Sequence, residues 1–361
     1  GHKYSTFPAA ALAWNIGKEN FMENVDVISK LKIRASWGLT GSQAISPYAT
    51  MSAFNNVTYP FTPGSSSSGI QAGNPSNLDL KWETTAQTDI GLDFGLFDDR
   101  LTLEADYYIK NTRDLLLNKS VPNYQGGGSV VSNIGSIRNS GIDLALTGKI
   151  IEKKDISLES TVNVSFLKNK VLDLGEQETV YVASNLTGIN DGMYDFIYQV
   201  GQPLGTIYGL NYLGPWKKSE AAEAAKYGMV PGDARYEDLD NNYVIDASDY
   251  KIIGYGMPKV TFGWNTNFAY KGLSVNMFWQ GTFGNDKLNY NRCINMMASR
   301  DVTGARFSEI KDRWTEDNQD AFLPAWSPSS KWYPVSNLWL ENGGYLRLKN
   351  LSIAYNFDIK K

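Results

Sequence analysis

The chain contains repeated stretches of about ten residues in which apolar and polar side chains alternate strictly. The clearest stretch runs from Leu101 to Lys110, where one set of alternate residues is apolar and the other is polar and includes Glu104 and Asp106. Successive side chains of a β-strand point to opposite faces of the sheet. The pattern therefore predicts a sheet with one apolar face and one polar, charged face.

The same alternation predicts about nine long strands. In chain order they are 6–16, 31–40, 84–97, 101–113, 140–149, 156–166, 260–270, 273–283 and 345–357. A strand of about eleven residues, tilted by about 45°, spans roughly 26 Å, which matches the apolar band of an outer-membrane barrel. We therefore predict an all-β chain that forms part of a large antiparallel transmembrane β-barrel.

The connections between the predicted strands alternate between short turns, such as 98–100, and long loops. In transmembrane barrels the short turns face the periplasm and the long loops face the exterior. We therefore predict that 1–361 is a partial barrel domain with long extracellular loops at 169–259 and 284–344. Within the first loop, a short helix is predicted over 219–227, with Ser219 as its N-cap and Gly228 just after its end.

Composition excludes several classes of function. The net charge is −4, from 34 basic and 38 acidic residues, and no basic stripe is present, which argues against nucleic-acid binding. Cys293 is the only cysteine and His2 the only histidine, so an internal disulfide, a catalytic Ser-His-Asp arrangement and a histidine-rich zinc site are excluded. The carboxylates on the predicted strands alternate with apolar residues, which favours hydrated side chains over a glycosidase acid–base pair. We expect no enzyme activity.

An acidic twelve-residue segment has the oxygen spacing of a calcium-binding loop. Its candidate ligands are Asp238, Asp240, Asn242, Val244 (through its carbonyl), Asp246 and Asp249. The segment departs from the usual pattern because Tyr243 stands where glycine makes the sharp turn, and because Asp249 replaces glutamate at the last position. The alternative is a solvated acidic turn that is capped by its own aspartates.

Two further groups of residues are candidates for contacts with a ligand or a partner. The aromatic residues of the second long loop could stack on sugar rings, although packing of the loop is the interpretation that we favour; they are Trp314, Trp326, Trp332, Tyr333 and Trp339. The polar face of the predicted sheet would line the lumen of a barrel. We assign to it Glu104, Asp106, Asp143, Glu159, Asn163 and Asn265.

Six blocks spread along the chain resemble the SusC/RagA-like TonB-dependent outer-membrane transporters. They are LKIRASWGLTG (31–41), NLDLKWETTAQTDIG (77–91), NIGSIRNSGID (133–143), GQPLGTIYG (201–209), PGD (231–233) and YLRLKNL (345–351). Each block alone is short, but together they follow the order of the family over nearly the whole chain. The family commonly has glycine at the position of Tyr243.

The resemblance implies a barrel of about 22 strands, of which this chain supplies the later middle part. It implies that a plug domain with a TonB box, and the final strands, are encoded outside this chain. It also implies import of an oligosaccharide or peptide across the outer membrane of a Gram-negative bacterium. The partners would be a SusD-like surface lipoprotein, the TonB complex and outer-membrane lipid.

Two other functions remain open from the sequence. The first is a secreted, soluble all-β carbohydrate-binding protein, whose apolar sheet faces would pack on each other. The second is a passive porin, which would have the same wall but no dependence on TonB.

Overall fold

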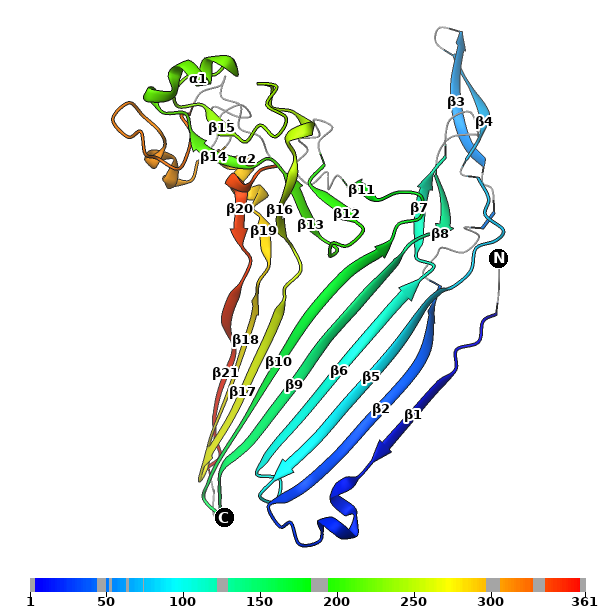
Figure 1. Ribbon diagram of the computed structural model, residues 1–361, viewed down its shortest axis with the longest axis vertical. Coiled ribbons are helices and arrows are strands. Elements are labelled where there is room, and N and C mark those ends of the chain that lie inside the picture. Colours follow the sequence, from blue (N-terminus) through cyan, green and yellow to red (C-terminus); the bar gives the residue numbers. More distant parts are fainter. Residues whose placement is uncertain are drawn as a thin grey trace. The chain divides into compact units, whose positions relative to one another are not determined.

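The structure is a computed structural model that describes residues 4–43, 50–51, 54–62, 65–73, 75–121, 129–182, 194–296, 306–326 and 335–357. Its long strands are Ala9–Trp14 (β1), Ile28–Ser42 (β2), Glu83–Leu96 (β5), Leu101–Arg113 (β6), Ser136–Lys153 (β9), Ile156–Asp173 (β10), Val260–Tyr270 (β17), Leu273–Phe283 (β18) and Tyr345–Tyr355 (β21). They form one 9-stranded sheet in the order β1-β2-β5-β6-β9-β10-β17-β18-β21 (Figure 1). Pairing from β1 to β10 is antiparallel. The predicted all-β sheet of about nine long strands is confirmed.

The register places apolar residues of neighbouring strands opposite one another. Ile90 on β5 pairs with Tyr107 on β6, and Tyr107 pairs with Ile142 on β9. Ile142 pairs in turn with Phe166 on β10. These four side chains are 53%, 47%, 42% and 46% exposed, respectively. A continuous row of exposed apolar side chains marks a surface for a membrane or a partner, and it does not match the buried apolar faces of a soluble sandwich.

Strands β9 and β10 are longer than predicted, at 18 residues each. Polar contacts hold their extensions: Asn169 donates to Asn139 over 2.6 Å, and Nε of Arg138 donates to Oδ1 of Asn111 over 2.7 Å. Polar residues of this kind occupy both faces of the extensions. The extensions therefore carry no alternation that would reveal them in the sequence.

The connection between β5 and β6 is a tight turn with unusual backbone geometry. Phe97, Asp98 and Asp99 have φ angles of 57°, 55° and 57°, which non-glycine residues adopt infrequently. Ser29 on β2 holds the turn, because its hydroxyl donates to the Asp99 carboxylate over 2.7 Å and accepts the Asp99 backbone N–H over 3.0 Å. The cross-strand side chain thus compensates for the local strain.

The described chain divides into two compact units. The first comprises 1–178, 262–279 and 348–361, and so holds most of the long sheet. Over the described residues, its connections contain two hairpins and two 3₁₀ turns. These elements are Phe54–Thr62 (β3) with Ser65–Ala72 (β4), Leu116–Ser120 (β7) with Ser129–Asn133 (β8), Ile16–Lys18 (η1) and Asn20–Met22 (η2).

The second unit comprises 179–261 and 280–347, which overlap the two predicted long loops. Its strands are Thr179–Val182 (β11), Phe196–Gln199 (β12), Thr206–Gly209 (β13), Tyr212–Pro215 (β14), Ala234–Tyr236 (β15), Lys251–Tyr255 (β16), Asp286–Leu288 (β19) and Leu340–Asn342 (β20). Its helical elements are Lys218–Glu220 (η4), Ala221–Lys226 (α1), Ala247–Asp249 (η5), Tyr290–Met296 (α2), Ser308–Asp312 (η6) and Asn337–Trp339 (η7). The loops are therefore folded over their described residues, and their extracellular location stays a prediction.

The helical segment predicted over 219–227 begins two residues earlier than expected. Lys217, and not Ser219, is the N-cap residue of η4, and its backbone N–H donates to the Glu220 carboxylate over 3.1 Å. The preceding residue, Trp216, is buried and fixes the start of the helical segment. The predicted end is right, because Gly228 follows α1 with a φ of +65°. None of the described helices is both long and apolar enough to span a bilayer.

Candidate functional site

The polar face of the long sheet holds a cluster of ion pairs around Arg34. Its Nη2 lies 2.9 Å from a carboxylate oxygen of Asp93 on β5 and 2.9 Å from one of Asp106 on β6. Its Nε also donates to Asp93 over 3.0 Å, and Nζ of Lys30 lies 3.7 Å from the same carboxylate. Asp93 is 7% exposed, so these two cations supply the partners that a buried carboxylate needs.

A glycine makes the Arg34 cluster possible. Gly91 lies opposite both Arg34 and Asp106 in the register. A Cβ atom at Gly91 would lie 2.2 Å from Oδ1 of Asp106 and 2.7 Å from Cζ of Arg34. The guanidinium therefore crosses the β5 backbone through the space that a side chain would fill. Sequence reasoning missed Arg34, because the cluster becomes visible only when the strand register is known.

The residues predicted to line the lumen lie along this polar face. Asp143 pairs with Asp106, while Glu104 pairs with both Asp93 and Ala145. Glu159 and Asn163 lie on β10, where they pair with Lys149 and Ala145 of β9. Asn265 lies on β17, where its side-chain oxygen accepts a hydrogen bond from Asn276 over 3.0 Å. The structure thus distributes these residues over one face instead of gathering them into one site.

The acidic segment 238–249 forms a compact loop. Carboxylate oxygens of Asp238, Asp240 and Asp249 lie within 4.8 Å of one another. Tyr243 has a φ of +64°, so it adopts the conformation that glycine usually provides at this position. The Tyr243 ring packs edge-on against Tyr227, with centroids 5.4 Å apart. The sharp turn therefore forms without glycine.

The carboxylates of this loop also accept hydrogen bonds from the loop itself. Asp249 is fully buried and accepts the backbone N–H of Leu239 over 2.7 Å and of Asp246 over 3.0 Å. Burial opposes ionisation of Asp238, but backbone N–H groups, led by that of Tyr243, outweigh it and hold the pKa of Asp238 below its ordinary value. The loop is thus closed by its own hydrogen bonds. Its oxygen ligands have the chemistry that Ca²⁺ prefers.

The described tryptophans of the second long connection are packed against other residues of the unit instead of being exposed on its surface. Trp339 is fully buried and Trp314 is 9% exposed. Trp326 is half-buried and packs against the hydrophobic core that contains Trp339. This arrangement agrees with the packing interpretation. Trp332 and Tyr333 lie outside the described residues.

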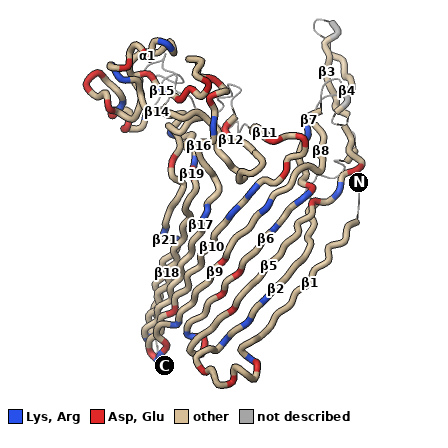
Figure 2. Tube along the Cα trace, in the orientation of Figure 1, with Lys and Arg blue, Asp and Glu red and all other residues tan. Residues whose placement is uncertain are grey.

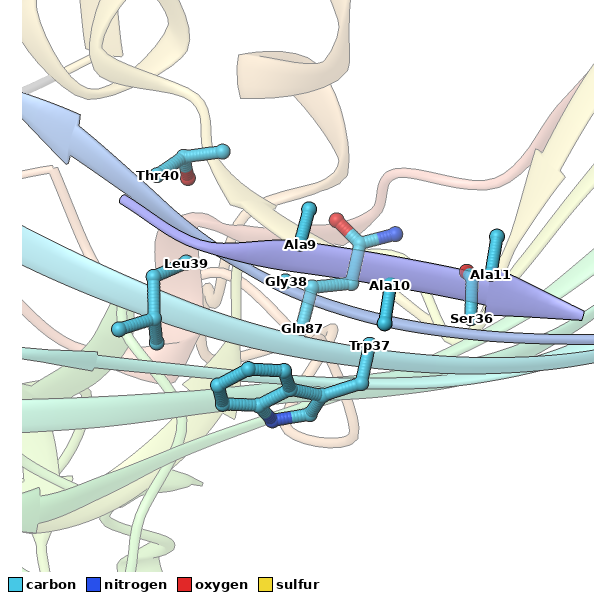
Figure 3. Close-up of a pocket in the computed structure, with 9 residues that line it drawn as sticks. All are labelled: Ala9, Ala10, Ala11, Ser36, Trp37, Gly38, Leu39, Thr40 and Gln87. Carbon is cyan, nitrogen blue, oxygen red and sulfur yellow. The ribbon is translucent and has the colours of Figure 1, made fainter. Parts of the chain in front are cut away.

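A pocket of about 350 Å³ lies along the edge strand β1 (Figure 3). Ala9–Ala11, Ser36–Thr40 and Gln87 line it, so it contains no ionisable side chain. Trp37 and Leu39 project away from the side on which Ala9 and Gln87 project (Figure 3). The pocket therefore follows the edge of the sheet, and it offers no acid, base or metal ligand for chemistry.

Comparisons with known proteins agree with this architecture. The family model described as "TonB dependent receptor-like, beta-barrel" matches residues 2–361. A TonB-dependent receptor of Formosa agariphila is 34% identical over 364 residues, which cover 100% of this chain and 36% of that protein. The TonB-dependent receptor SusC of Bacteroides thetaiotaomicron is 27% identical over 368 residues, covering 99% of this chain and 34% of that protein.

A solved structure has the same fold. The structure of the RagAB peptide transporter matches with a TM-score of 0.81 and 25% identity, covering 97% of this chain and 37% of that chain. The chain thus spans about a third of the length of the relatives that it matches. The family match over almost every residue and the two-faced sheet lead to one assignment. The chain belongs to the TonB-dependent receptor family and forms part of its β-barrel.

Proposed function

We propose that the protein is a TonB-dependent transporter that imports a bulky nutrient across the outer membrane of a Gram-negative bacterium. The observation that carries the proposal is the two-faced sheet, with exposed apolar residues on one face and the Arg34 cluster on the other. The apolar face meets lipid and the polar face lines the lumen. The short turns face the periplasm, and the long connections face the exterior.

Partner proteins supply the energy for this transport and the lid that covers the external side of the barrel. A plug domain with a TonB box, outside this chain, couples the barrel to the TonB complex, and a SusD-like surface lipoprotein covers the external side. The RagAB relative is described as a peptide transporter, and SusC is also a relative. The likeness to RagAB supports a peptide, and the resemblance of the sequence to the SusC/RagA-like transporters supports an oligosaccharide or a peptide as the nutrient class.

Deletion of the gene from its bacterium should abolish growth on one nutrient of this class. Growth is measured on neutral oligosaccharides and on peptides as sole carbon sources, and the intact gene restores it. Removal of the TonB box should have the same effect as the deletion, because a passive porin would need no TonB. Normal growth without the TonB box, together with lost growth in the deletion, would favour the porin.

We further propose that the loop 238–249 binds Ca²⁺ and rigidifies the segment around it. The close approach of the Asp238, Asp240 and Asp249 carboxylates supports this proposal, since like charges at such distances repel unless a cation or hydrogen bonds compensate. The intact, chelated protein should release or absorb heat on calcium titration, with a dissociation constant of about 0.1–1 mM, as in other extracellular calcium modules.

Asp240→Ala should remove this calcium heat, because Asp240 supplies one of the three clustered carboxylates. Asp317→Ala is the matched control, since Asp317 is an exposed acidic residue of the same unit and lies outside the loop. The absence of calcium heat in the wild type would refute the metal site and leave the self-capped acidic turn.

A further inference from the structure

Strands β17 and β18 are an uncharged pair of neighbouring strands in the long sheet. Their sequences, VTFGWNTNFAY and LSVNMFWQGTF, contain no acidic or basic residue. The strands β2, β5, β6, β9 and β10 all carry charged residues, as the colouring of Figure 2 shows. Strand β1 is also uncharged, whereas β21 carries Arg347 and Lys349, which alternate out of phase with Asn350. The polar face therefore has a charged part, on β2, β5, β6, β9 and β10, and an uncharged part on β17 and β18.

Four asparagines form a hydrogen-bonded array on β17, β18 and the adjoining strand β21. Nδ2 of Asn276 on β18 donates to Oδ1 of Asn265 over 3.0 Å and to Oδ1 of Asn267 over 2.6 Å, both on β17. Oδ1 of Asn276 accepts from Nδ2 of Asn350 on β21 over 3.2 Å. We call these four residues the amide array. Both N–H groups of Asn276 are used, so the central amide is fixed by its neighbours.

The outer members of the amide array keep groups available for a ligand. Among the described residues, Nδ2 of Asn265, Nδ2 of Asn267 and Oδ1 of Asn350 have no hydrogen-bond partner. Asn267 and Asn350 are exposed, and Asn265 is half-buried. The array thus presents two amide donors and one amide acceptor in positions set by Asn276.

An aromatic ring lies on the same uncharged part of the polar face. A Cβ atom at Gly263 would lie 3.6 Å from Cε2 of Phe278 and 4.0 Å from Cβ of Asn163. Gly263 alternates in phase with Asn265 and Asn267, so its missing side chain belongs to the polar face. The Phe278 ring therefore packs over Gly263, and Asn163 borders the same position.

We infer that the amide array and Phe278 form a contact surface for a neutral, hydroxyl-rich nutrient, an oligosaccharide, on its way through the barrel. Amides donate and accept hydrogen bonds as sugar hydroxyls do, and an aromatic ring suits the apolar face of a sugar. A charged peptide would find no opposite charge on β17 or β18. The inference rests on the proposed transport function and narrows its substrate class.

The test uses the full-length transporter in the bacterium that encodes it. The probes are maltoheptaose, laminarihexaose, xylohexaose and tryptic peptides of casein, each as sole carbon source and in a direct uptake assay. The gene deletion should abolish use of one of the three oligosaccharides. Asn265→Leu/Asn267→Leu should slow uptake of that sugar about tenfold, because two hydrogen-bonding groups are lost. Phe278→Ala should have an effect of similar size.

Asn15→Leu is the matched control, because it replaces an exposed amide by leucine in the connection between β1 and η1, outside the strands of the long sheet. It should change uptake less than about twofold. The amount of folded protein in the outer membrane is measured for every variant by unheated gel mobility. If the double variant does not fold, Asn350→Ala tests the same surface, since it removes the exposed acceptor on β21 together with the hydrogen bond that Asn350 donates to Asn276.

Each other outcome has a distinct meaning. Unchanged growth of the deletion strain on every probe would refute the proposed transport function itself. A deletion strain that loses only the casein peptides, or variants with normal sugar uptake, would overturn the oligosaccharide inference and leave transport intact. Vancomycin sensitivity with normal uptake would overturn it too, because the array would then be holding the plug in place.

Discussion

Replacement of Leu144 by arginine should destabilise the folded barrel by about 2–4 kcal/mol, whereas arginine at the next residue, Ala145, should cost less than about 1 kcal/mol. The two positions lie side by side on β9 and point to opposite faces. Leu144 pairs with Ala105 and Val164 on the apolar face. An arginine there would carry its charge into lipid, where it has no partner.

Ala145 is a matched control because it lies at the same depth of the sheet. It pairs with Glu104 and Asn163 on the polar face, where an arginine can meet a carboxylate and water. The full-length protein is refolded into phospholipid vesicles, and its free energy of unfolding is measured by urea titration with unheated gel mobility as the readout. Equal losses at the two positions would contradict the assignment of the apolar face to lipid.

Trp339→Ala should destabilise the second unit by about 3–5 kcal/mol, the usual cost of truncating a fully buried tryptophan. Trp339 is 0% exposed and belongs to a core with Leu210, Met296 and Leu338. The guanidinium of Arg292 lies 5.8 Å from the centre of its ring, so the substitution also removes a cation–π contact. The expected result is local opening of this unit, with the long sheet still folded.

Hydrogen exchange of the amides in 206–236 is the appropriate measurement, because it reports opening of one unit within a large protein. Trp14→Ala serves as the control, since Trp14 lies on β1 of the long sheet and is 53% exposed. It should leave exchange in the second unit unchanged. Normal exchange in the Trp339 variant, combined with weaker sugar binding, would instead support a direct role of this tryptophan in stacking on the nutrient.

The long strands could be predicted because their alternation and their short turns are both local signals. The predicted bounds 101–113, 260–270 and 273–283 are those of β6, β17 and β18. The strands of the second unit could not be predicted in the same way. They are only three to five residues long, which is too short for a period-two pattern to stand out.

The candidate sites also differ in how far apart their residues lie in the sequence. The acidic loop was visible in the sequence because its potential ligands lie within twelve residues. The Arg34 cluster joins β2 to β6, and the amide array joins Asn276 to Asn350, 74 positions apart in the chain. Such contacts depend on strand order and register, which a single sequence reveals only through the pairing of its elements.

The division of the second unit into two chain segments has a consequence for the order of folding. Its segments, 179–261 and 280–347, flank the hairpin β17–β18. Hydrogen bonds join the segments, among them those from Leu210 to Val335 and from the backbone N–H of Tyr212 to Asn337. A folded second unit thus holds the two ends of the hairpin together and lowers the entropy that its closure costs. Loss of this unit should therefore slow assembly of the adjoining part of the barrel wall.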